Sequence, residues 1–139
     1  MKFSEFDGKK WEENGAYYDT CLIPYTGLSG AETPVQAAEA LERLRDFLEL
    51  AEVPFQGRLV TYPAIQYAEP GNWGYVNGIC SKVKSSNFKF VIVMSADAEL
   101  SVTDLYESDL TLSLRGFPGI TQQEISRRIG AEIERMWQK

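Results

Sequence analysis

The strongest strand signal in the chain reads Phe88-Lys89-Phe90-Val91-Ile92-Val93-Met94. Aromatic and β-branched residues favour strands, because their side chains pack well on a pleated surface. A nearly continuous apolar run predicts a strand that is buried on both faces, as in a parallel sheet covered by helices. We therefore expect this strand at the centre of the sheet.

Three weaker strand signals surround it. One covers residues 17–24 and is expected to end at Pro24, and another covers residues 58–62 and is expected to end at Pro63. The third covers residues 110–114, where leucine alternates with threonine or serine. Such alternation is typical of a strand with one wetter face, so we place this last strand at an edge.

Helices are expected between the strands. Thr33-Pro34-Val35-Gln36 forms a capping box with proline at the first helical position, and this helix is expected to stop at Pro54. A second capping box, Thr121-Gln122-Gln123-Glu124, begins the last helix, and Glu39 and Arg43 are expected to pair on the outer face of the first. The apolar stripes predicted for the three helices are Ala37, Leu41, Leu44, Leu48 and Ala51; Trp73, Val76, Cys80 and Val83; and Ile125, Ile129, Ile133 and Met136.

The order of elements predicts the fold class. Strands that alternate with helices indicate right-handed βαβ units, and hence a three-layer α/β sandwich with a mainly parallel sheet. We expect four strands in the flavodoxin-like order 2-1-3-4, within one domain that spans residues 1–139. Residues 1–14 are expected to form a short docked helix, residues 64–72 a loop, and residues 95–107 a short helix.

Composition excludes several function classes. The chain has 139 residues, a net charge of −6 and no histidine. Without histidine there is no histidine-based triad and no histidine-ligated zinc, and the scattered basic residues do not suit nucleic-acid binding. No segment looks like a secretory signal or a membrane span. We expect a cytoplasmic protein without cofactor or metal, with Cys21 and Cys80 as buried, reduced thiols.

A ligand site is expected beyond the carboxyl ends of the strands, where the strand order reverses. The residues that the sequence places there are Thr26, Tyr67, Trp73, Asp97 and Arg115. A small metabolite could bind at this rim, whether or not a reaction follows.

Three more specific ligand sites compete with plain structural interpretations of the same residues. The loop 25–32 has two glycines but no G-x-G-x-x-G pattern, so a connecting loop is favoured over a nucleotide cradle. The turn 115–119 offers an arginine near a helix start, but Glu124 at the same end would repel an anion. The acidic residues between positions 97 and 109 match no metal loop, so a solvated face is favoured over a magnesium site.

The aromatic loop 67–75 supports a different function. Tyr67, Trp73 and Tyr75 share it with one proline and two glycines, and tryptophan and tyrosine dominate the hot spots of protein interfaces. We predict a non-catalytic module that binds a protein partner or a second copy of itself, with Trp73 as the anchor. Packing of Trp73 against the core is the alternative, and the acidic residues 97–109 could steer a basic partner.

Several short motifs also resemble the YpiF-like family of small uncharacterised proteins from Bacillus-like bacteria. They are Tyr18-Asp19-Thr20 with Ile23-Pro24, Gly57-Arg58 followed by Pro63 and Tyr67, and the closing capped helix. The resemblance implies no catalytic residues. It implies a helper role around the production of respiratory complexes, because genes of that family tend to lie near those of a menaquinol–cytochrome c reductase.

Overall fold

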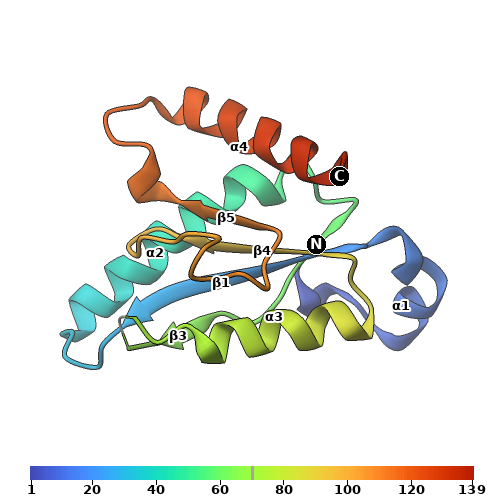
Figure 1. Cartoon of the computed structure of the whole chain (residues 1–139), viewed down its shortest axis with the longest axis horizontal. Helices are drawn as coiled ribbons and strands as arrows, with labels where there is room; N and C mark the ends of the chain where they lie inside the picture. Colours follow the sequence, from blue (N-terminus) through green and yellow to red (C-terminus); the bar gives the residue numbers. More distant parts are fainter. Residues whose placement is uncertain (70) are drawn as a thin grey trace.

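The computed structural model describes residues 1–69 and 71–139; Pro70, within the predicted aromatic loop, lies outside the described residues. The chain folds into an α/β sandwich whose strand pairs are all parallel within this described part. The sheet order is β2-β1-β4-β5, with β3 attached to β1, which confirms the predicted fold class and order (Figure 1). The strands are β1 (Thr20–Leu28), β2 (Leu59–Thr61), β3 (Ile65–Tyr67), β4 (Phe90–Ser95) and β5 (Leu110–Ser113). The α-helices are α1 (Gly8–Asn14), α2 (Pro34–Glu52), α3 (Gly74–Ser86) and α4 (Gln122–Trp137).

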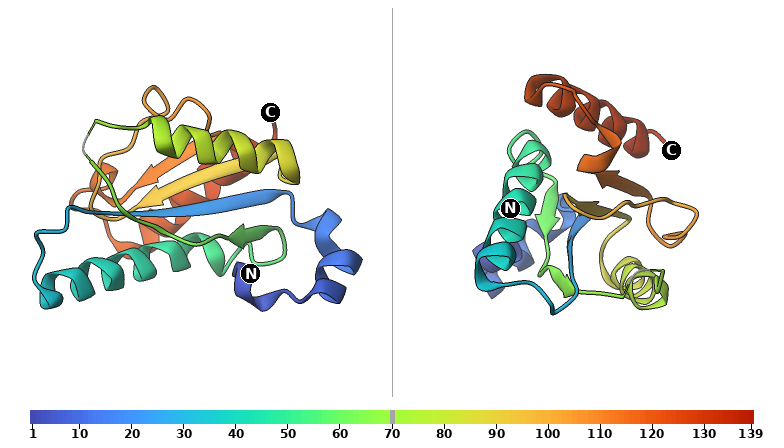
Figure 2. Two further views of the ribbon diagram at one scale, coloured as in Figure 1. Left: turned by 90° about the horizontal axis from the view of Figure 1, so that it is seen from below. Right: turned by 90° about the vertical axis from the view of Figure 1, so that its left-hand side faces the viewer.

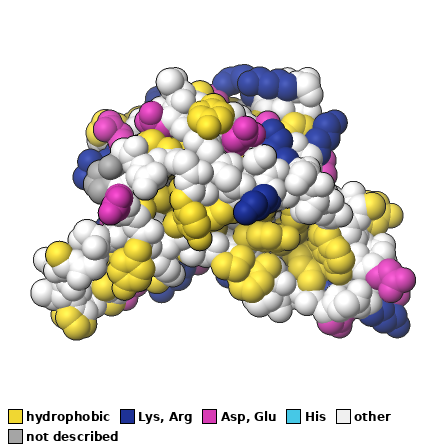
Figure 3. Space-filling model, turned by 60° about the horizontal axis from the view of Figure 1, so that its bottom comes forward, with side chains coloured by type: hydrophobic (Ala, Val, Ile, Leu, Met, Phe, Trp, Pro, Cys, Tyr) yellow, Lys and Arg dark blue, Asp and Glu magenta, His cyan; other side chains and the backbone are white. Residues whose placement is uncertain are grey.

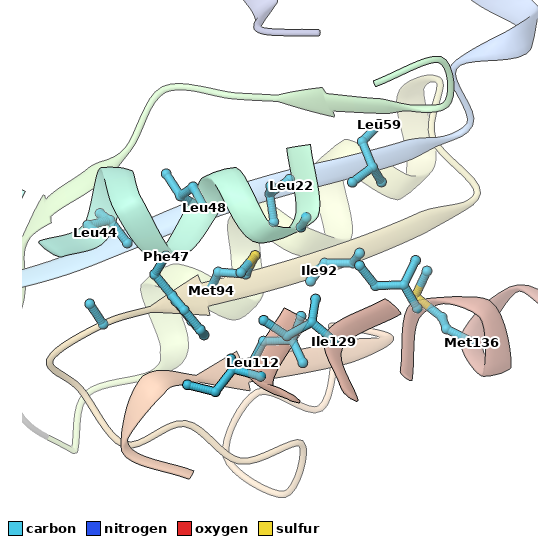
Figure 4. Close-up of a cluster of buried hydrophobic side chains, with 14 of the residues drawn as sticks. Leu22, Leu44, Phe47, Leu48, Leu59, Ile92, Met94, Leu112, Ile129 and Met136 are labelled. Atoms are coloured by element: carbon cyan, nitrogen blue, oxygen red, sulfur yellow. The ribbon is translucent and has the colours of Figure 1, made fainter. Parts of the chain in front are cut away.

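Two hydrophobic cores lie on opposite faces of the sheet. Helices α2 and α4 cover one face, where the side chains of Leu22, Ile92 and Met94 point (Figures 2 and 4). Helix α3 covers the other face, together with aromatic residues of the N-terminal segment. Val91 and Val93 point into this second core and are fully buried. Strand β4 therefore buries both of its faces, which explains its continuous apolar sequence.

Strand β1 is longer than predicted and runs through Pro24 to Leu28. In a parallel strand the N–H and C=O of one residue point to one neighbouring strand, and those of the next residue point to the other. The Leu22 carbonyl accepts from the N–H of Tyr62 at 2.9 Å, so every second residue from Leu22 points the same way. Pro24 therefore faces the side of β2 and β3, at the break between these two short strands. No ladder bond is needed there, so a proline is tolerated inside the strand.

The segment 64–72, predicted as a loop, contains β3. This strand pairs with the end of β1 through Tyr25 and Leu28, with a register shift between them. Its three residues carry little periodic signal, and it exists because the protruding end of β1 offers free backbone groups.

Thr33 and Thr121 cap α2 and α4 as predicted, but two charged side chains, Arg43 and Glu124, pair differently from the prediction. Thr33 and Gln36 form the expected capping box, whereas Arg43 pairs with Asp97 through two bonds of 2.8 and 2.9 Å instead of with Glu39. At α4 the Thr121 hydroxyl accepts from the N–H of Glu124, but the Glu124 carboxylate turns to Arg127 and Arg128. Two arginines within one turn attract that carboxylate more strongly than one backbone N–H, and they lower its pKa to about 2.

Residues 96–109 form turns rather than the predicted short helix. Leu105 is fully buried in the core beneath α3. The Asn77 side chain donates to the carbonyl of Asp104 at 2.9 Å and accepts from the N–H of Glu107 at 3.1 Å. These tertiary bonds accompany single local turns, such as the bond from the N–H of Leu105 to the carbonyl of Ser101 at 2.9 Å, and hold the segment in a non-helical path.

The N-terminal segment docks as predicted, although it combines α1 with 3-10 turns at residues 3–5 and 15–17. The Met1 carbonyl accepts from the N–H of Thr61 at 2.8 Å, so the first residues lie beside the edge of β2. Within the described residues, no helix is long and apolar enough to cross a membrane.

The two cysteines occupy the core beneath α3, and both are buried free thiols, as predicted. Burial raises the pKa of Cys80 to about 11, and the pKa of Cys21 is raised even further by burial and by the neighbouring Cys80. Thiolate is the reactive form, so neither side chain is suited to nucleophilic chemistry.

An ion pair joins the start of β1 to the residue before β2. Asp19 accepts two bonds from the Arg58 guanidinium, at 2.8 and 3.0 Å, and one from the Thr20 hydroxyl at 3.0 Å. Burial raises the pKa of the Asp19 carboxyl, but the bonds from Arg58 and Thr20 outweigh it, and the pKa is lowered overall. The pair therefore stabilises the folded state at pH values above the pKa that Asp19 has in the unfolded chain. This contribution is lost as the pH falls through the lower pKa that Asp19 has in the folded protein.

We expect Asp19→Asn to reduce the free energy of unfolding by about 1 kcal/mol at about pH 7, with the difference closing towards about pH 2.5. Urea unfolding of both proteins at the two pH values measures it. Asp46→Asn is the control, since Asp46 pairs with Arg45 on the open surface. A pH-independent difference for Asp19→Asn would contradict the assignment.

Candidate functional site

A pocket opens at the carboxyl ends of β1 and β3, beside the start of α3. Its volume is about 420 Å³. Apolar side chains of Leu28, Ile65 and Val76 line it, and Tyr67 and Tyr75 stand at its sides. Polar groups are supplied by Ser29, Glu69 and Asn72. The pocket lies at the carboxyl ends of two strands, as expected for a ligand site, but on the β3 side of β1 rather than at the β1–β4 position where the strand order reverses.

The two tyrosines are the exposed aromatic groups of this pocket. Tyr67, at the end of β3, is 66% exposed, and Tyr75, in the first turn of α3, is 70% exposed. The backbone next to Tyr67 is tied to β1, because the N–H of Ala68 donates to the carbonyl of Leu28 at 3.1 Å, and Tyr75 belongs to α3. The tyrosine rings therefore project from a scaffold that is held in place before anything binds.

Trp73, the predicted anchor, is only partly exposed. It precedes the first residue of α3, and its ring lies 5.4 Å from that of Tyr25, centroid to centroid. The carbonyl of Trp73 accepts from the N–H of Asn77 at 2.9 Å, which closes the first turn of the helix. Trp73 thus positions the loop against the core, and the two tyrosines remain as the outward-facing aromatic residues.

The five residues predicted for a metabolite site do not converge. Tyr67 lines the pocket, whereas the buried Thr26 hydroxyl donates to the Gln66 side chain at 2.7 Å. Asp97 is held by Arg43 on α2, and Arg115 lies exposed in the 3-10 turn after β5. The residues follow different strands, and each side chain has a local role that sequence position does not reveal.

The loop after β1 has no free cradle for a phosphate. The Glu32 carboxylate accepts from the N–H groups of Ser29 and Gly30, both at 2.9 Å. Bonds from the Ser29 and Gly30 backbone lower the pKa of Glu32, so it stays ionised and occupies these donors itself. Residues 29–32 therefore form a plain connecting segment, whereas residues 25–28 of the predicted loop belong to β1.

Two of the acidic residues between positions 97 and 109 are engaged in contacts with distant segments. Asp97 pairs with Arg43, and Asp109 accepts from Lys84 at 3.2 Å and from the N–H of Val91 at 2.8 Å. Among residues 1–69 and 71–139, no cluster of three or more potential ligand side chains could hold a metal ion.

A second hollow was not predicted from the sequence. It has a volume of about 620 Å³ and lies between the N-terminal segment and β2, lined by Phe3, Phe6, Trp11, Val60 and Tyr62. Figure 3 shows hydrophobic side chains gathered on this side of the molecule. The spacing of aromatic residues among charges at positions 3–11 was the available signal, but it indicates docking of the segment equally well.

No protein-family model, no curated protein and no solved structure matches this chain. The resemblance to the YpiF-like family therefore stays a prediction, and the site is interpreted from its own residues.

Proposed function

We propose that this protein is a non-catalytic binding module that recognises a protein partner through the pocket between Tyr67 and Tyr75. The observation that carries the proposal is the pair of exposed tyrosines, 66% and 70% accessible, beside an apolar pocket. Tyrosine offers a large, rigid contact surface at a small cost in conformational entropy. Exposed aromatic groups around a cavity that an apolar side chain can enter are typical of interface hot spots.

The surroundings suit a peptide-like ligand. Ser29, Glu69 and Asn72 can exchange hydrogen bonds with a backbone or with polar side chains at the margin of the pocket. Tyr67 lies on β3, which pairs with β1, and Tyr75 lies in the first turn of α3, so little ordering is needed on binding. We place the module in the cytosol, and the YpiF-like resemblance directs the search for a partner to proteins that help to produce respiratory complexes.

The proposal is tested by affinity capture from the native cell with the wild type and with Tyr67→Ala/Tyr75→Ala. Loss of hot-spot residues costs about 2 kcal/mol or more each, so recovery of the specific partners is expected to fall at least about tenfold. The matched control is Tyr17→Ala/Tyr106→Ala, which removes two tyrosines that are 71% and 69% exposed elsewhere on the surface. Thermal unfolding confirms that all three proteins are folded.

Equal recovery by the two double variants would show that the pocket is not the interface. A wild type that captures nothing and runs as a monomer would overturn the interaction function and favour the alternative, a small-metabolite site. The pocket volume lies within the range of about 300–1,000 Å³ that small-molecule sites occupy, which is the observation in favour of that alternative. A ligand that binds only the folded state must raise the melting temperature, so a screen of nucleotides, sugar phosphates and carboxylates decides it.

A further inference from the structure

The outer edge of β5 presents unpaired backbone groups. Within the described residues β5 pairs with β4 alone, and it forms the end of the sheet (Figure 2). The N–H of Asp109 donates to the carbonyl of Val91 at 2.9 Å, so the odd-numbered residues turn their backbone groups towards β4. Leu110 and Leu112 consequently direct their N–H and C=O groups outward. Leu110 is partly exposed and Leu112 is 3% exposed, and unpaired strand edges are templates for the addition of a strand.

A groove follows this edge. Its volume is about 510 Å³, and β5 contributes Thr111, Leu112 and Ser113 to it. Leu100 lines it on one side, and residues of α4 line it on the other. The edge of β5 therefore lines the groove, where an extended chain would contact both the backbone of β5 and the side chains of α4.

The charge of the groove is opposite to that of the whole molecule. The chain carries a net charge of −6, yet Arg127, Arg128 and Arg135 line the groove with Glu132 as the single acidic residue. Arg127 and Arg128 bond to Glu124, and Arg135 bonds to Glu132. The side chains of Arg127, Arg128 and Arg135 are 69%, 49% and 63% exposed. Exposed ion pairs contribute only about 0–1 kcal/mol, so the guanidinium groups can turn to another carboxylate at little cost.

We propose that the edge of β5 binds an extended acidic peptide segment of a partner protein, which adds a strand to the sheet. Backbone bonds to Leu110 and Leu112 would supply the pairing, and alternate acidic side chains would meet the arginines of α4. A second copy of this chain suits the edge less well, because pairing β5 with β5 brings two arginine-rich helices together. This surface lies at the opposite end of the sheet from the Tyr67–Tyr75 pocket and does not depend on it.

The test uses three capped, fluorescein-labelled peptides. One alternates glutamate with valine or threonine, a second carries lysine in place of each glutamate, and a third repeats the acidic peptide with N-methylated backbone on its pairing side. We expect the acidic peptide to bind at least about tenfold more tightly than either of the others, with an affinity that falls as salt rises. The amides of Leu110 and Leu112 should shift in the NMR spectrum and exchange more slowly with solvent.

Matched variants separate local from general charge effects. Arg127→Gln/Arg128→Gln is expected to weaken binding at least about tenfold, whereas Arg45→Gln/Lys82→Gln changes the net charge equally and should leave affinity within about twofold. Leu110→Pro removes an outward N–H at a position where an edge strand tolerates proline, and it should abolish binding. Tyr67→Ala/Tyr75→Ala should bind the peptide normally, which keeps this test independent of the proposed function.

The proposal is overturned by any of four results. These are equal affinity for the acidic and lysine peptides, equal damage by the two charge variants, amide shifts that avoid β5, and absence of binding up to about 1 mM peptide. A dimer that forms through β5 in sedimentation experiments would likewise replace the acidic peptide with a second copy as the occupant.

Discussion

Ile92→Ala is expected to lower the free energy of unfolding by about 2–5 kcal/mol. Ile92 lies in β4, is fully buried, and packs between α2 and α4 in the larger core (Figure 4). Truncation removes apolar contacts and leaves a cavity, because neighbouring strands cannot collapse into the space. The loss would be a large share of the total stability of a domain, about 5–15 kcal/mol.

Urea unfolding followed by tryptophan fluorescence measures the change. Ile92→Val, which removes one methyl group, should cost about 0.5–1.5 kcal/mol. Val35→Ala on the exposed face of α2 is the control and should change stability by less than about 0.5 kcal/mol. A loss below about 1 kcal/mol for Ile92→Ala would mean that β4 is not the packed centre of the sheet.

Trp137→Ala is expected to cost about 2–4 kcal/mol, although Trp137 is third from the end of the chain. Its ring packs edge-on against Phe55, with centroids 5.1 Å apart, and lies 3.9 Å from the Arg58 guanidinium carbon. The indole N–H donates to the buried Thr20 hydroxyl at 2.8 Å. The last turn of α4 is thereby clamped to the starts of β1 and β2.

Two further measurements separate the hydrogen bond to Thr20 from the contact with Arg58. Trp137→Phe keeps most of the ring packing but leaves the Thr20 hydroxyl without its donor, so we expect a loss of about 1 kcal/mol from that bond. A double-mutant cycle with Arg58→Ala should give a coupling energy of about 0.5–2 kcal/mol. If Trp137→Ala were no more costly than Gln138→Ala at the exposed neighbouring position, the clamp would not exist.

Part of the Tyr67–Tyr75 pocket is predictable from local sequence, whereas the groove at β5 is not. The clustering of aromatic residues in the loop 67–75 indicates a binding surface, and Tyr67 and Tyr75 do line a pocket. The sequence could not distinguish Trp73 from its neighbours, because its contact with Tyr25 joins segments that are far apart along the chain. The groove at β5 was likewise hidden, since it forms only when α4 lies beside that strand.

Local sequence signals are sufficient to define the elements in which those signals are strong. The apolar run around Ile92 defines the central strand, and the caps at Thr33 and Thr121 begin the helices, because residues close in sequence supply both partners of each contact. Tertiary structure alone decided the pairing of Arg43 with Asp97, the passage of β1 through Pro24, and the short strand β3. Each of these depends on backbone or charged groups that distant segments bring within bonding distance. Local sequence patterns do not show which distant residues become neighbours in the fold.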